Sequence, residues 1–587
     1  MSETATPAAA PAIRRLSIER FRGIKSLTWY PESSVNIILG GGDVGKTTLL
    51  DAVALLFSPV NSISLSDTDY HARNIAAGFA IEAIVSLSPG SGIGGLFKPS
   101  WPWGWNGKDA SVPNIEDSGA AAGDPVYRLR VRGTEDLELV YEIVQPDGSL
   151  DSFPVALRRS IGLVRLSGDD RNDRDLRLVQ GSALDRLLTD KSLRSRMASE
   201  LAKSDIRNEL NDAGKKALED LDEAFAARSL PDGLDLAITG GQGPSIASLV
   251  GLTAKRDGTT LPLASWGAGT RRLAALAIAE RNQGEAPITI VDEVERGLEP
   301  YRQRMLMEKL EAGRSQTFVT THSPSAIAAS SQATIWYVDG SGAIGALNAE
   351  QIARHRKIDP EAFLARLAIA GEGITEVGFI TRLLERAFGT GLEQHGIRVT
   401  DGGGHEKTLG LLEALAAGGL SFGGFVDDEN KHPERWARLG TKLDKLLFRW
   451  PAQCTESNVI AAIPDDELEA LIDDPDGVKA GTRRRHLALR LGIDDKDFAS
   501  LKAASGESLR AVIIEAARGV VPTGKEAEKN EYKSHASAWF KSLDGGRELA
   551  DKVISLGAWP QLKSQLLPFC NAVRVALGLP PADDILP

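Results

Sequence analysis

Gly40-Gly41-Gly42-Asp43-Val44-Gly45-Lys46-Thr47 fills every position of the phosphate-loop pattern G-x-x-x-x-G-K-[ST]. Residues 35–39 before it are an apolar run typical of a buried strand, and residues 48–56 after it have helical apolar spacing. In such a strand-loop-helix, backbone N–H groups bind phosphate, the lysine reaches the outer phosphates and the threonine holds Mg2+. We therefore predict a site for ATP and Mg2+. The residues expected to bind the nucleotide are Gly40, Gly42, Asp43, Gly45, Lys46, Thr47 and Thr48, with Thr47 also on the metal.

The length and composition of the chain indicate several domains. Its 587 residues exceed the roughly 250–300 at which a single core stops growing. The content of 42% hydrophobic and 25% charged residues is ordinary for a globular protein, and no apolar run is long enough to cross a bilayer, so we expect no membrane partner. Residues 1–12 lack the basic start and apolar core of a signal peptide. We expect them to be a disordered tail of a cytoplasmic protein.

Net charge and cysteine content limit how the protein can contact nucleic acid and which cysteine sites it can contain. The net charge of −12 gives no overall attraction to nucleic acid, so a contact with DNA depends on local basic patches or bridging metal ions. Cys454 and Cys570 are far apart and belong to no Cys-x-x-Cys pair, which argues against disulfides and against a zinc ribbon. We expect both to be buried thiols.

The residues around the phosphate loop predict an antiparallel sheet. Residues 13–30 alternate apolar and polar side chains and turn at a glycine, which indicates an edge hairpin. Strands are expected at 81–87, 127–132 and 137–144. Between them lies a loop insertion with Trp101, Trp103 and Trp105, which we expect to pack against its own domain rather than to stack on bases.

Residues 181–232 are rich in helix formers, with apolar residues at intervals of three and four. They predict amphipathic helices that divide the nucleotide domain into halves at 13–180 and 233–355. Such an element is either a local cover or a dimerisation arm.

Three further motifs follow in the second half. The small-residue turn of 265–270, with Ser265, Gly267 and Gly269, precedes an apolar helix, and a hydrophobic strand at 288–291 ends in Asp292-Glu293. This strand resembles Walker B, and the resemblance implies that Asp292 orients the Mg2+ shell and that Glu293 polarises the attacking water. A third strand ends at His322.

In this order, the motifs resemble the ATPase heads of the SMC-like branch of the ABC superfamily. The turn at 265–270 would be the signature, although it departs from the L-S-G-G-Q form, and His322 would be the switch histidine. The resemblance implies that each ATP lies between the phosphate loop of one subunit and the signature of the other, and hence a homodimer. The Q-loop glutamine is either Gln180 or absent.

Residues beyond 355 predict a second chemistry. A strand at 367–370 leads into Gly371-Glu372-Gly373 and a helix, a second strand and helix follow, and a third strand ends in Asp427-Asp428-Glu429. Alternating strands and helices indicate a parallel sheet, whose carboxyl edge gathers these acids in one crevice. Asp427 and Glu429 are expected on one face because alternate residues of an extended segment point the same way.

Several carboxylates in one crevice repel each other unless cations neutralise them, and oxygen ligands suit Mg2+ or Mn2+. We predict a metal site with Glu372 and Asp427 as the main ligands and Glu376, Glu429 and Glu456 as further candidates. Paired ions in such a site cleave phosphodiester bonds by activating water and holding the leaving oxygen. The alternative is that these acids are ordinary carboxylates at helix N-termini.

The acids of 372 and 427 resemble those of a Toprim domain, placed at 356–545 and followed by helices at 546–587. An ABC head followed by a Toprim domain resembles the overcoming-lysogenization-defect (OLD) family of nucleases, to which the Gabija defence nuclease is also similar. The resemblance implies an ATP-hydrolysing, metal-dependent DNA endonuclease in anti-phage defence or DNA processing, in some relatives with a helicase encoded nearby. It also implies a catalytic lysine, for which Lys541 is the candidate and Lys533 a neighbour.

The sequence leaves competing functions open. One is an SMC-like, DNA-associated ATPase clamp with a Toprim domain that does not cleave. A topoisomerase or primase is disfavoured because there is no cysteine zinc module and no tyrosine in an evident cleavage context. The basic run 483–486 either contacts phosphates or forms a solvated helix face.

Overall fold

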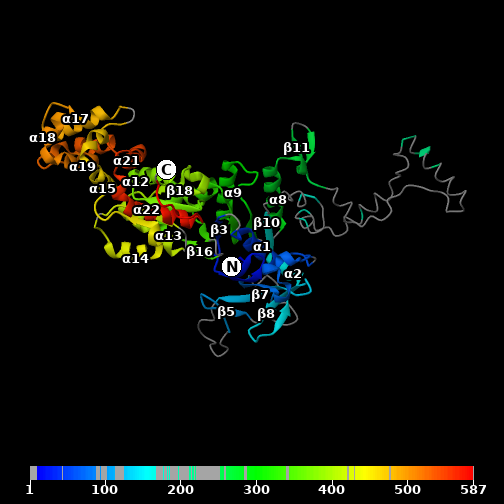
Figure 1. Cartoon of the computed structure of the whole chain (residues 1–587). Coiled ribbons are helices and arrows are strands. Elements are labelled where there is room, and N and C mark those ends of the chain that lie inside the picture. The colour runs from blue at the N-terminus through cyan, green and yellow to red at the C-terminus, as the bar shows by residue number, and fades with distance from the viewer. Residues whose placement is uncertain are drawn as a thin grey trace, which may run out of the picture. The chain divides into compact units, whose positions relative to one another are not determined.

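Figure 1 shows the computed structural model of the chain. The chain divides into two compact units. The first comprises Met1–Ile37 and Thr47–Ala326, and the second comprises Ile38–Lys46 and Ile327–Pro587. The described residues are 10–41, 44–61, 63–87, 93, 102–112, 124–166, 251–256, 259–282, 287–338, 343–418, 422–428, 430–474 and 477–585, with single residues and pairs between 176 and 219. The predicted helical element at 181–232 and Gln180 therefore lie almost entirely outside them.

The first unit contains the predicted antiparallel sheet. The hairpin of β1 and β2 is confirmed, with Ile18 opposite Leu27, and β7 pairs with β8 as expected. Trp103 packs within this sheet, because its indole donates a hydrogen bond of 2.9 Å to the Val144 carbonyl. The strands are β1 (Ala12–Phe21), β2 (Ile24–Trp29), β4 (Phe79–Ser86), β5 (Trp103–Trp105), β6 (Ala110–Ser111), β7 (Pro125–Gly133), β8 (Leu139–Val144) and β9 (Leu150–Ser152).

A parallel sheet in the first unit brings distant motifs onto neighbouring strands. β13 (Ile288–Val291) lies between β10 (Leu163–Leu166) and β14 (Thr317–Thr320), and both pairings are parallel. β13 and β14 are buried along their whole length, as is typical of a parallel sheet covered on both faces. The helices that accompany these strands include α1 (Lys46–Leu56), α2 (Val155–Ile161), α8 (Ala268–Asn282) and α9 (Pro300–Ala312).

Strand β3 (Val35–Gly40) belongs to both units. Val35–Ile37 belongs to the first unit, and Ile38–Gly40 belongs to the second. In the sheet, β3 lies between β14 of the first unit and β15 of the second. β15 (Thr334–Val338) pairs in turn with β16 (Ile344–Leu347) in an antiparallel manner.

The second unit also holds the parallel sheet predicted for 367–429. Its order is β18-β17-β19-β20, and every pairing is parallel. Each strand leads into a helix, so the carboxyl ends of the strands lie at one edge. The elements are β17 (Leu367–Gly371), α12 (Ile374–Phe388), β18 (Ile397–Asp401), α13 (His405–Ala417), β19 (Phe422–Val426), α14 (Pro433–Leu443), β20 (Leu447–Arg449) and α15 (Thr455–Ala462).

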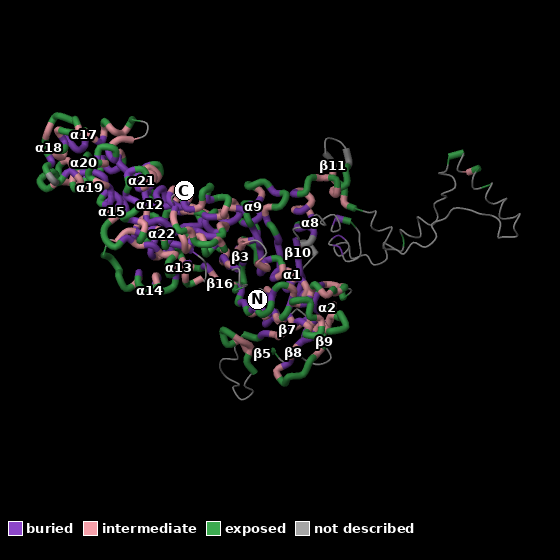
Figure 2. Tube along the Cα trace, in the orientation of Figure 1, coloured by how far each residue is buried: buried purple, intermediate pink, exposed green. Residues whose placement is uncertain are grey.

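Helices complete the second unit and share one hydrophobic core with the parallel sheet. Figure 2 shows buried stretches along α12 and α22, which contribute many of the core residues. α12 and α21 lie so close together that only glycine fits at Gly378 and Gly546. A Cβ at either position would collide with the backbone of the other helix. The helices are α11 (Glu350–Ile358), α16 (Leu468–Ile472), α17 (Ala480–Leu491), α18 (Phe498–Ser505), α19 (Leu509–Arg518), α20 (Lys529–Ala538), α21 (Leu543–Ser555) and α22 (Trp559–Ala576).

Among the described residues, no helix combines the length and the apolar character needed to pass through a membrane.

Candidate functional site

The lysine of the phosphate loop is bonded to carbonyl groups at the start of the same loop. Lys46 is buried, and its Nζ donates hydrogen bonds to the carbonyl oxygens of Gly40 at 3.0 Å and Gly41 at 2.6 Å. Gly45 has a φ of +97°, a conformation that a side chain rarely adopts. Thr47, by contrast, is exposed at the start of α1. Gly42 and Asp43 lie outside the described residues.

The Asp-Glu turn after β13 is fixed by a threonine of the neighbouring strand. The Thr320 hydroxyl donates a hydrogen bond to the Asp292 carboxylate and accepts one of 2.8 Å from the Glu293 N–H. Glu293 has a φ of +50°, and a non-glycine residue in this region costs free energy that the surroundings must offset. The structure thus holds Asp292 buried and Glu293 at the surface.

A buried arginine connects the small-residue turn to the Asp-Glu turn. Arg272 of α8 donates hydrogen bonds to the carbonyl oxygens of Asp292, Glu293 and Arg296, the last two at 2.7 and 3.0 Å. Burial lowers the pKa of Arg272. This residue was not predicted from the sequence; the available signal was an arginine among apolar residues directly after the turn. Ser265, Gly267 and Gly269 precede it, and the first two lie toward the surface while Gly269 packs against the turn that contains Arg296.

Glu295 is a second residue that was not predicted. Its carboxylate accepts a hydrogen bond of 2.7 Å from the Thr321 hydroxyl and another of 2.7 Å from the His322 N–H. The loop with His322 is therefore tied to the loop after Glu293 through backbone and side-chain contacts. The His322 residue itself is exposed.

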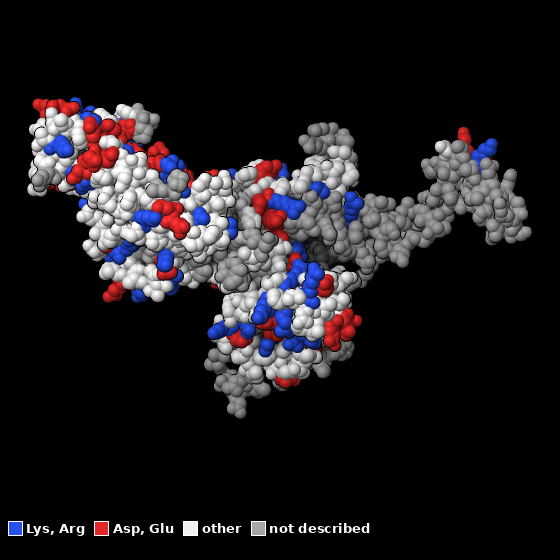
Figure 3. Space-filling model, in the orientation of Figure 1, with Lys and Arg blue, Asp and Glu red and all other residues white. Residues whose placement is uncertain are grey.

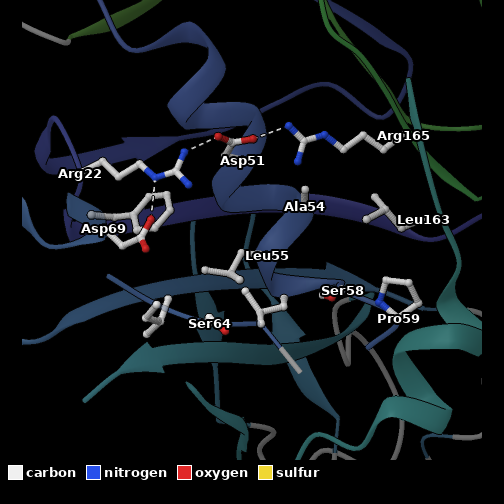
Figure 4. Close-up of a pocket in the computed structure, with 13 residues that line it drawn as sticks. Arg22, Asp51, Ala54, Leu55, Ser58, Pro59, Ser64, Asp69, Leu163 and Arg165 are labelled. Carbon is white, nitrogen blue, oxygen red and sulfur yellow. Dashed lines mark hydrogen bonds and ion pairs between the residues drawn. The ribbon is translucent and has the colours of Figure 1, made fainter. Parts of the chain in front are cut away.

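A cavity of about 370 Å³ opens beside α1 in the first unit (Figure 4). Asp51, one helical turn after Thr47, forms ion pairs with both Arg22 and Arg165. Arg22 also donates a hydrogen bond of 3.0 Å to Asp69. The polar wall of the cavity is thus a set of paired charges.

The outer sheet of the first unit carries a local basic row. Arg128, Arg130 and Arg132 alternate along β7 and therefore share one face. Within the described ranges, their carboxylate partners are Glu82 and Glu142, at 2.6–2.8 Å. Figure 3 shows the blue side chains gathered over β7 and β8.

Four carboxyl groups meet at the carboxyl edge of the parallel sheet in the second unit. This acidic cluster consists of Glu372 after β17, Glu376 in the first turn of α12, Asp427 after β19 and Glu456 in the first turn of α15. Asp427 N–H donates a hydrogen bond of 3.1 Å to Glu372 Oε2. The sequence predicted this association of Glu372 with Asp427 because both follow neighbouring strands. Glu429, the remaining predicted ligand, lies outside the described residues.

Thr455 supports the acidic cluster and was not predicted. Its N–H and hydroxyl donate hydrogen bonds of 2.9 and 3.1 Å to Asp427 Oδ1. The Trp450 indole in turn donates a hydrogen bond of 2.9 Å to the Thr455 hydroxyl. Asp428 turns away from the cluster and pairs with Arg449.

Burial and mutual repulsion perturb the acidic cluster strongly. Burial raises the pKa of Glu376 well above its usual range, and Asp427 and Glu456 raise it further. Burial, followed by Glu456 and Glu372, raises the pKa of Asp427 to about 8. Burial beside Glu456 also raises the pKa of Cys454, which is only half-buried, to about 12.

The donor set of the acidic cluster fits a hard divalent cation in its chemistry, since oxygen ligands and unbalanced negative charge favour Mg2+ or Mn2+. Within the described part of the chain, however, no three His, Cys, Asp or Glu residues are arranged to hold a metal, so the side chains of the cluster do not form a complete set of ligands as they stand.

The basic residues predicted near the end of the second unit differ in burial: two lysines are exposed and one arginine is buried. Lys541 is exposed, and the residue before it accepts a hydrogen bond of 3.3 Å from Thr375 through its carbonyl, which places this turn beside the first turn of α12. Lys533 is exposed on α20. Arg483 is completely buried and forms a bidentate pair with Glu548 at 2.7 and 2.8 Å. The predicted phosphate contact or solvated face is therefore wrong for Arg483.

Comparison with known families identifies the nucleotide domain. Residues 145–328 match the family described as "AAA domain, putative AbiEii toxin, Type IV TA system". This part of the chain is an ATPase domain. The match contains Arg272, Asp292, Glu293 and His322, whereas the phosphate loop precedes it. It does not extend to the acidic cluster, for which the Toprim and OLD resemblance stays a prediction.

Solved structures are similar to more than half of the chain, at low identity. The crystal structure of the SmcHead bound to the C-winged helix domain of ScpA is 16% identical over 58% of this chain and 99% of its own, with a TM-score of 0.35. The recombination mediator protein RecF-ATPrS in the RecFOR pathway is 14% identical over 58% and 99%, with a TM-score of 0.31. The Smc head domain from Pyrococcus furiosus is 13% identical over 60% and 99%, with a TM-score of 0.32. No curated protein matches this sequence.

Proposed function

We propose that this protein is a homodimeric ATPase and divalent-metal-dependent DNA endonuclease of the OLD type. The single observation that carries the nuclease is the acidic cluster, in which Glu372 and Asp427 are joined by a hydrogen bond of 3.1 Å. Two acids of the cluster, Glu376 and Asp427, have raised pKa values, which are hard to explain for ordinary surface carboxylates. The ATPase domain supports the other half of the proposal.

In the ATPase, Lys46 exchanges the carbonyl oxygens of its own loop for the outer phosphates of ATP. Thr47 and Asp292 hold Mg2+, which neutralises phosphate charge when it is bound. Glu293 polarises the attacking water, and His322 lies on a loop that Glu295 holds in place.

The signature turn binds the nucleotide of the partner subunit in this proposal. Ser265 and Gly267 lie toward the surface, so they are accessible to a second copy of the chain. A homodimer would supply each ATP with one phosphate loop and one signature turn.

In the nuclease, Glu372 and Asp427 hold Mg2+ or Mn2+, with Glu376, Glu429 and Glu456 as further ligands. When bound, the ions supply an activated water and stabilise the leaving oxygen of a phosphodiester. Thr455 and the Asp427 N–H keep the two main carboxylates in place, and Lys541 contacts the phosphate. The basic row of Arg128, Arg130 and Arg132 is a local patch suited to the DNA backbone.

A plasmid-nicking assay tests the proposal. Supercoiled and linear DNA are incubated with the protein, Mg2+ or Mn2+, and no nucleotide, ATP or a non-hydrolysable analogue. We expect nicking and cleavage by the wild type and none by Glu372→Ala or Asp427→Ala. Glu434→Ala, an exposed acid on α14, is the matched control and should retain activity. The proposal fails if the wild type and Asp427→Ala leave DNA equally intact under every nucleotide condition.

The second candidate is a DNA-associated ATPase clamp that does not cleave. It is favoured by the spacing of the acidic cluster, which does not form a ready metal cage in the described residues. DNA-stimulated ATP hydrolysis without nicking would support it, and metal-dependent nicking that is lost in Glu372→Ala would exclude it. A cytoplasmic role in anti-phage defence or DNA processing, with a helicase encoded nearby as partner, belongs to the nuclease proposal.

A further inference from the structure

A buried histidine faces the acidic cluster and has no role in the proposed cleavage chemistry. His405 is the first residue of α13, and its exposed fraction is only 7%. Its Nδ1 lies 3.5 Å from Glu372 Oε2. The glycine loop before α13 also meets Glu372, because the Gly404 N–H donates a hydrogen bond of 2.8 Å to the Glu372 carbonyl.

Trp436 determines which nitrogen of the ring carries the proton. The Trp436 indole N–H lies 3.3 Å from His405 Nε2, and an indole nitrogen only donates. His405 Nε2 must therefore accept, which leaves the proton of the neutral ring on Nδ1. The ring is further packed against Trp436 at a centroid distance of 5.5 Å and against His432 at 6.4 Å, so its orientation is restricted.

The Nδ1–H group is an unused donor at the edge of the cluster. Among the described residues, His405 Nδ1 has no hydrogen-bond partner, although it is buried. Leaving a buried donor without a partner is costly. The neighbouring Glu372 Oε2 already accepts the Asp427 N–H, so two donors approach the same carboxylate oxygen. A protonated Nδ1 has no lone pair for a metal, which makes His405 a donor to Glu372 rather than a ligand.

We propose that His405, with its tautomer fixed by Trp436, is a positioning residue that orients the Glu372 carboxylate for binding a divalent cation. The inference rests on the proposed nuclease site and adds a residue to it. A hydrogen bond from the second shell fixes the rotation of a ligating carboxylate, and its loss lowers metal affinity by about 10–100-fold. Glu372 is the ligating carboxylate in the proposed nuclease site. Two donors, the Asp427 N–H and the His405 Nδ1–H, approach its Oε2 atom and can fix its rotation.

The test compares two amides that imitate different ring nitrogens. The amide nitrogen of asparagine occupies the place of Nδ1, whereas that of glutamine reaches the place of Nε2. Mn2+ binding to full-length wild type, His405→Asn and His405→Gln is titrated by electron paramagnetic resonance, with plasmid nicking measured in parallel. We expect His405→Gln to bind Mn2+ about tenfold or more weakly and His405→Asn to remain close to the wild type. Circular dichroism melts establish that both variants are folded.

Two further measurements separate positioning from coordination. Trp436→Phe removes the indole donor and should weaken Mn2+ binding less than His405→Gln does. Electron spin echo envelope modulation of the Mn2+-loaded wild type should show no coordinated imidazole nitrogen. A coordinated nitrogen, or equal Mn2+ affinity in wild type and His405→Gln, overturns the role of His405 while leaving the nuclease intact. A wild type that neither binds Mn2+ nor nicks DNA rejects the nuclease proposal, and the role of His405 with it.

Discussion

At the scale of single residues, Asp427 makes the stability of the metal-free protein depend on pH. Its pKa is raised from 3.8 to about 8 by burial, Glu456 and Glu372. A carboxyl with a raised pKa keeps its proton in the folded state where the unfolded chain has lost it. The stabilisation of the folded state by the protonated Asp427 carboxyl is therefore fully present below its pKa of 3.8 in the unfolded chain. This stabilisation is lost as the pH rises towards about 8. We expect the melting temperature in EDTA to fall across this range, as measured by differential scanning fluorimetry.

Asp427→Asn is the control for this pH dependence. The amide does not titrate, so the variant should show a smaller fall in melting temperature. Added Mn2+ should raise the melting temperature of the wild type most at the alkaline end, because the cation stabilises the ionised cluster. An unchanged pH profile in Asp427→Asn would contradict the assignment.

Arg483 gives a second prediction at this scale. Arg483→Met removes the bidentate partner of Glu548, which keeps Lys552 at 3.1 Å. Breaking a buried pair typically costs about 3–5 kcal/mol, and the two lysines that remain near Glu548, Lys552 at 3.1 Å and Lys479 at 3.8 Å, place this variant near the lower value. Thermal and urea unfolding measure the loss.

The neighbouring Arg485 is exposed and serves as the matched control, since surface substitutions usually change stability by about 0.5 kcal/mol or less. Equal stability of the Arg483→Met and Arg485→Met proteins would show that the buried pair contributes nothing. The sequence could not reveal this role, because Glu548 follows 65 residues later and a run of basic residues looks the same in either setting.

At the scale of elements, the close packing of α12 on α21 connects the acidic cluster to the turn with Lys541. Gly378→Ala would place a Cβ against the Leu543 carbonyl, and overpacking of this kind costs about 1–3 kcal/mol. We expect a lower melting temperature and weaker nicking, because the displaced turn contacts the first turn of α12 through Thr375. Both are measured on the same preparation.

Gly481→Ala in α17 is the control, because nothing lies within 4 Å of the added Cβ. It should be neutral or stabilising by up to about 1 kcal/mol. If both alanine variants behave alike, helix propensity rather than the α12–α21 contact determines the effect.

Elements with local signals were predictable, and elements defined by distant contacts were not. The strand-loop-helix at Lys46 and the acid-ended strands at Asp292 and Asp427 follow from patterns of a few residues. By contrast, Gly378 stands inside a helix, where glycine is unfavourable, and the sequence gives no reason for it. The reason is the contact with α21, which only the structure shows. Thr455 and Glu295 were missed for the same reason, since each acts through a partner on another element.

At the scale of the whole molecule, nucleotide binding should control assembly. Glu293→Gln is expected to bind ATP without hydrolysing it and to form a stable dimer with ATP and Mg2+, whereas Lys46→Ala should bind no ATP and stay monomeric. Size-exclusion chromatography with light scattering distinguishes these states. Normal ATP turnover by Glu293→Gln would show that the role of Glu293 has been assigned wrongly.

Asp427→Asn separates the two proposed activities of the chain. It should dimerise with ATP like the wild type and fail only in DNA cleavage, because the acidic cluster and most of the ATPase residues belong to different units. A loss of ATP-dependent dimerisation in this variant would contradict that separation.

The division of β3 between the units has a practical meaning for splitting the gene into separately expressed halves. A fragment that stops at Ala326 keeps the whole of β3 but lacks β15, the strand that lies beside it, and β16. A self-standing ATPase must therefore run past Leu347, the last residue of β16. The boundary between the two units thus runs through β3, and an exchange of either unit by recombination has to keep this strand together with β14 and β15, its neighbours in the sheet.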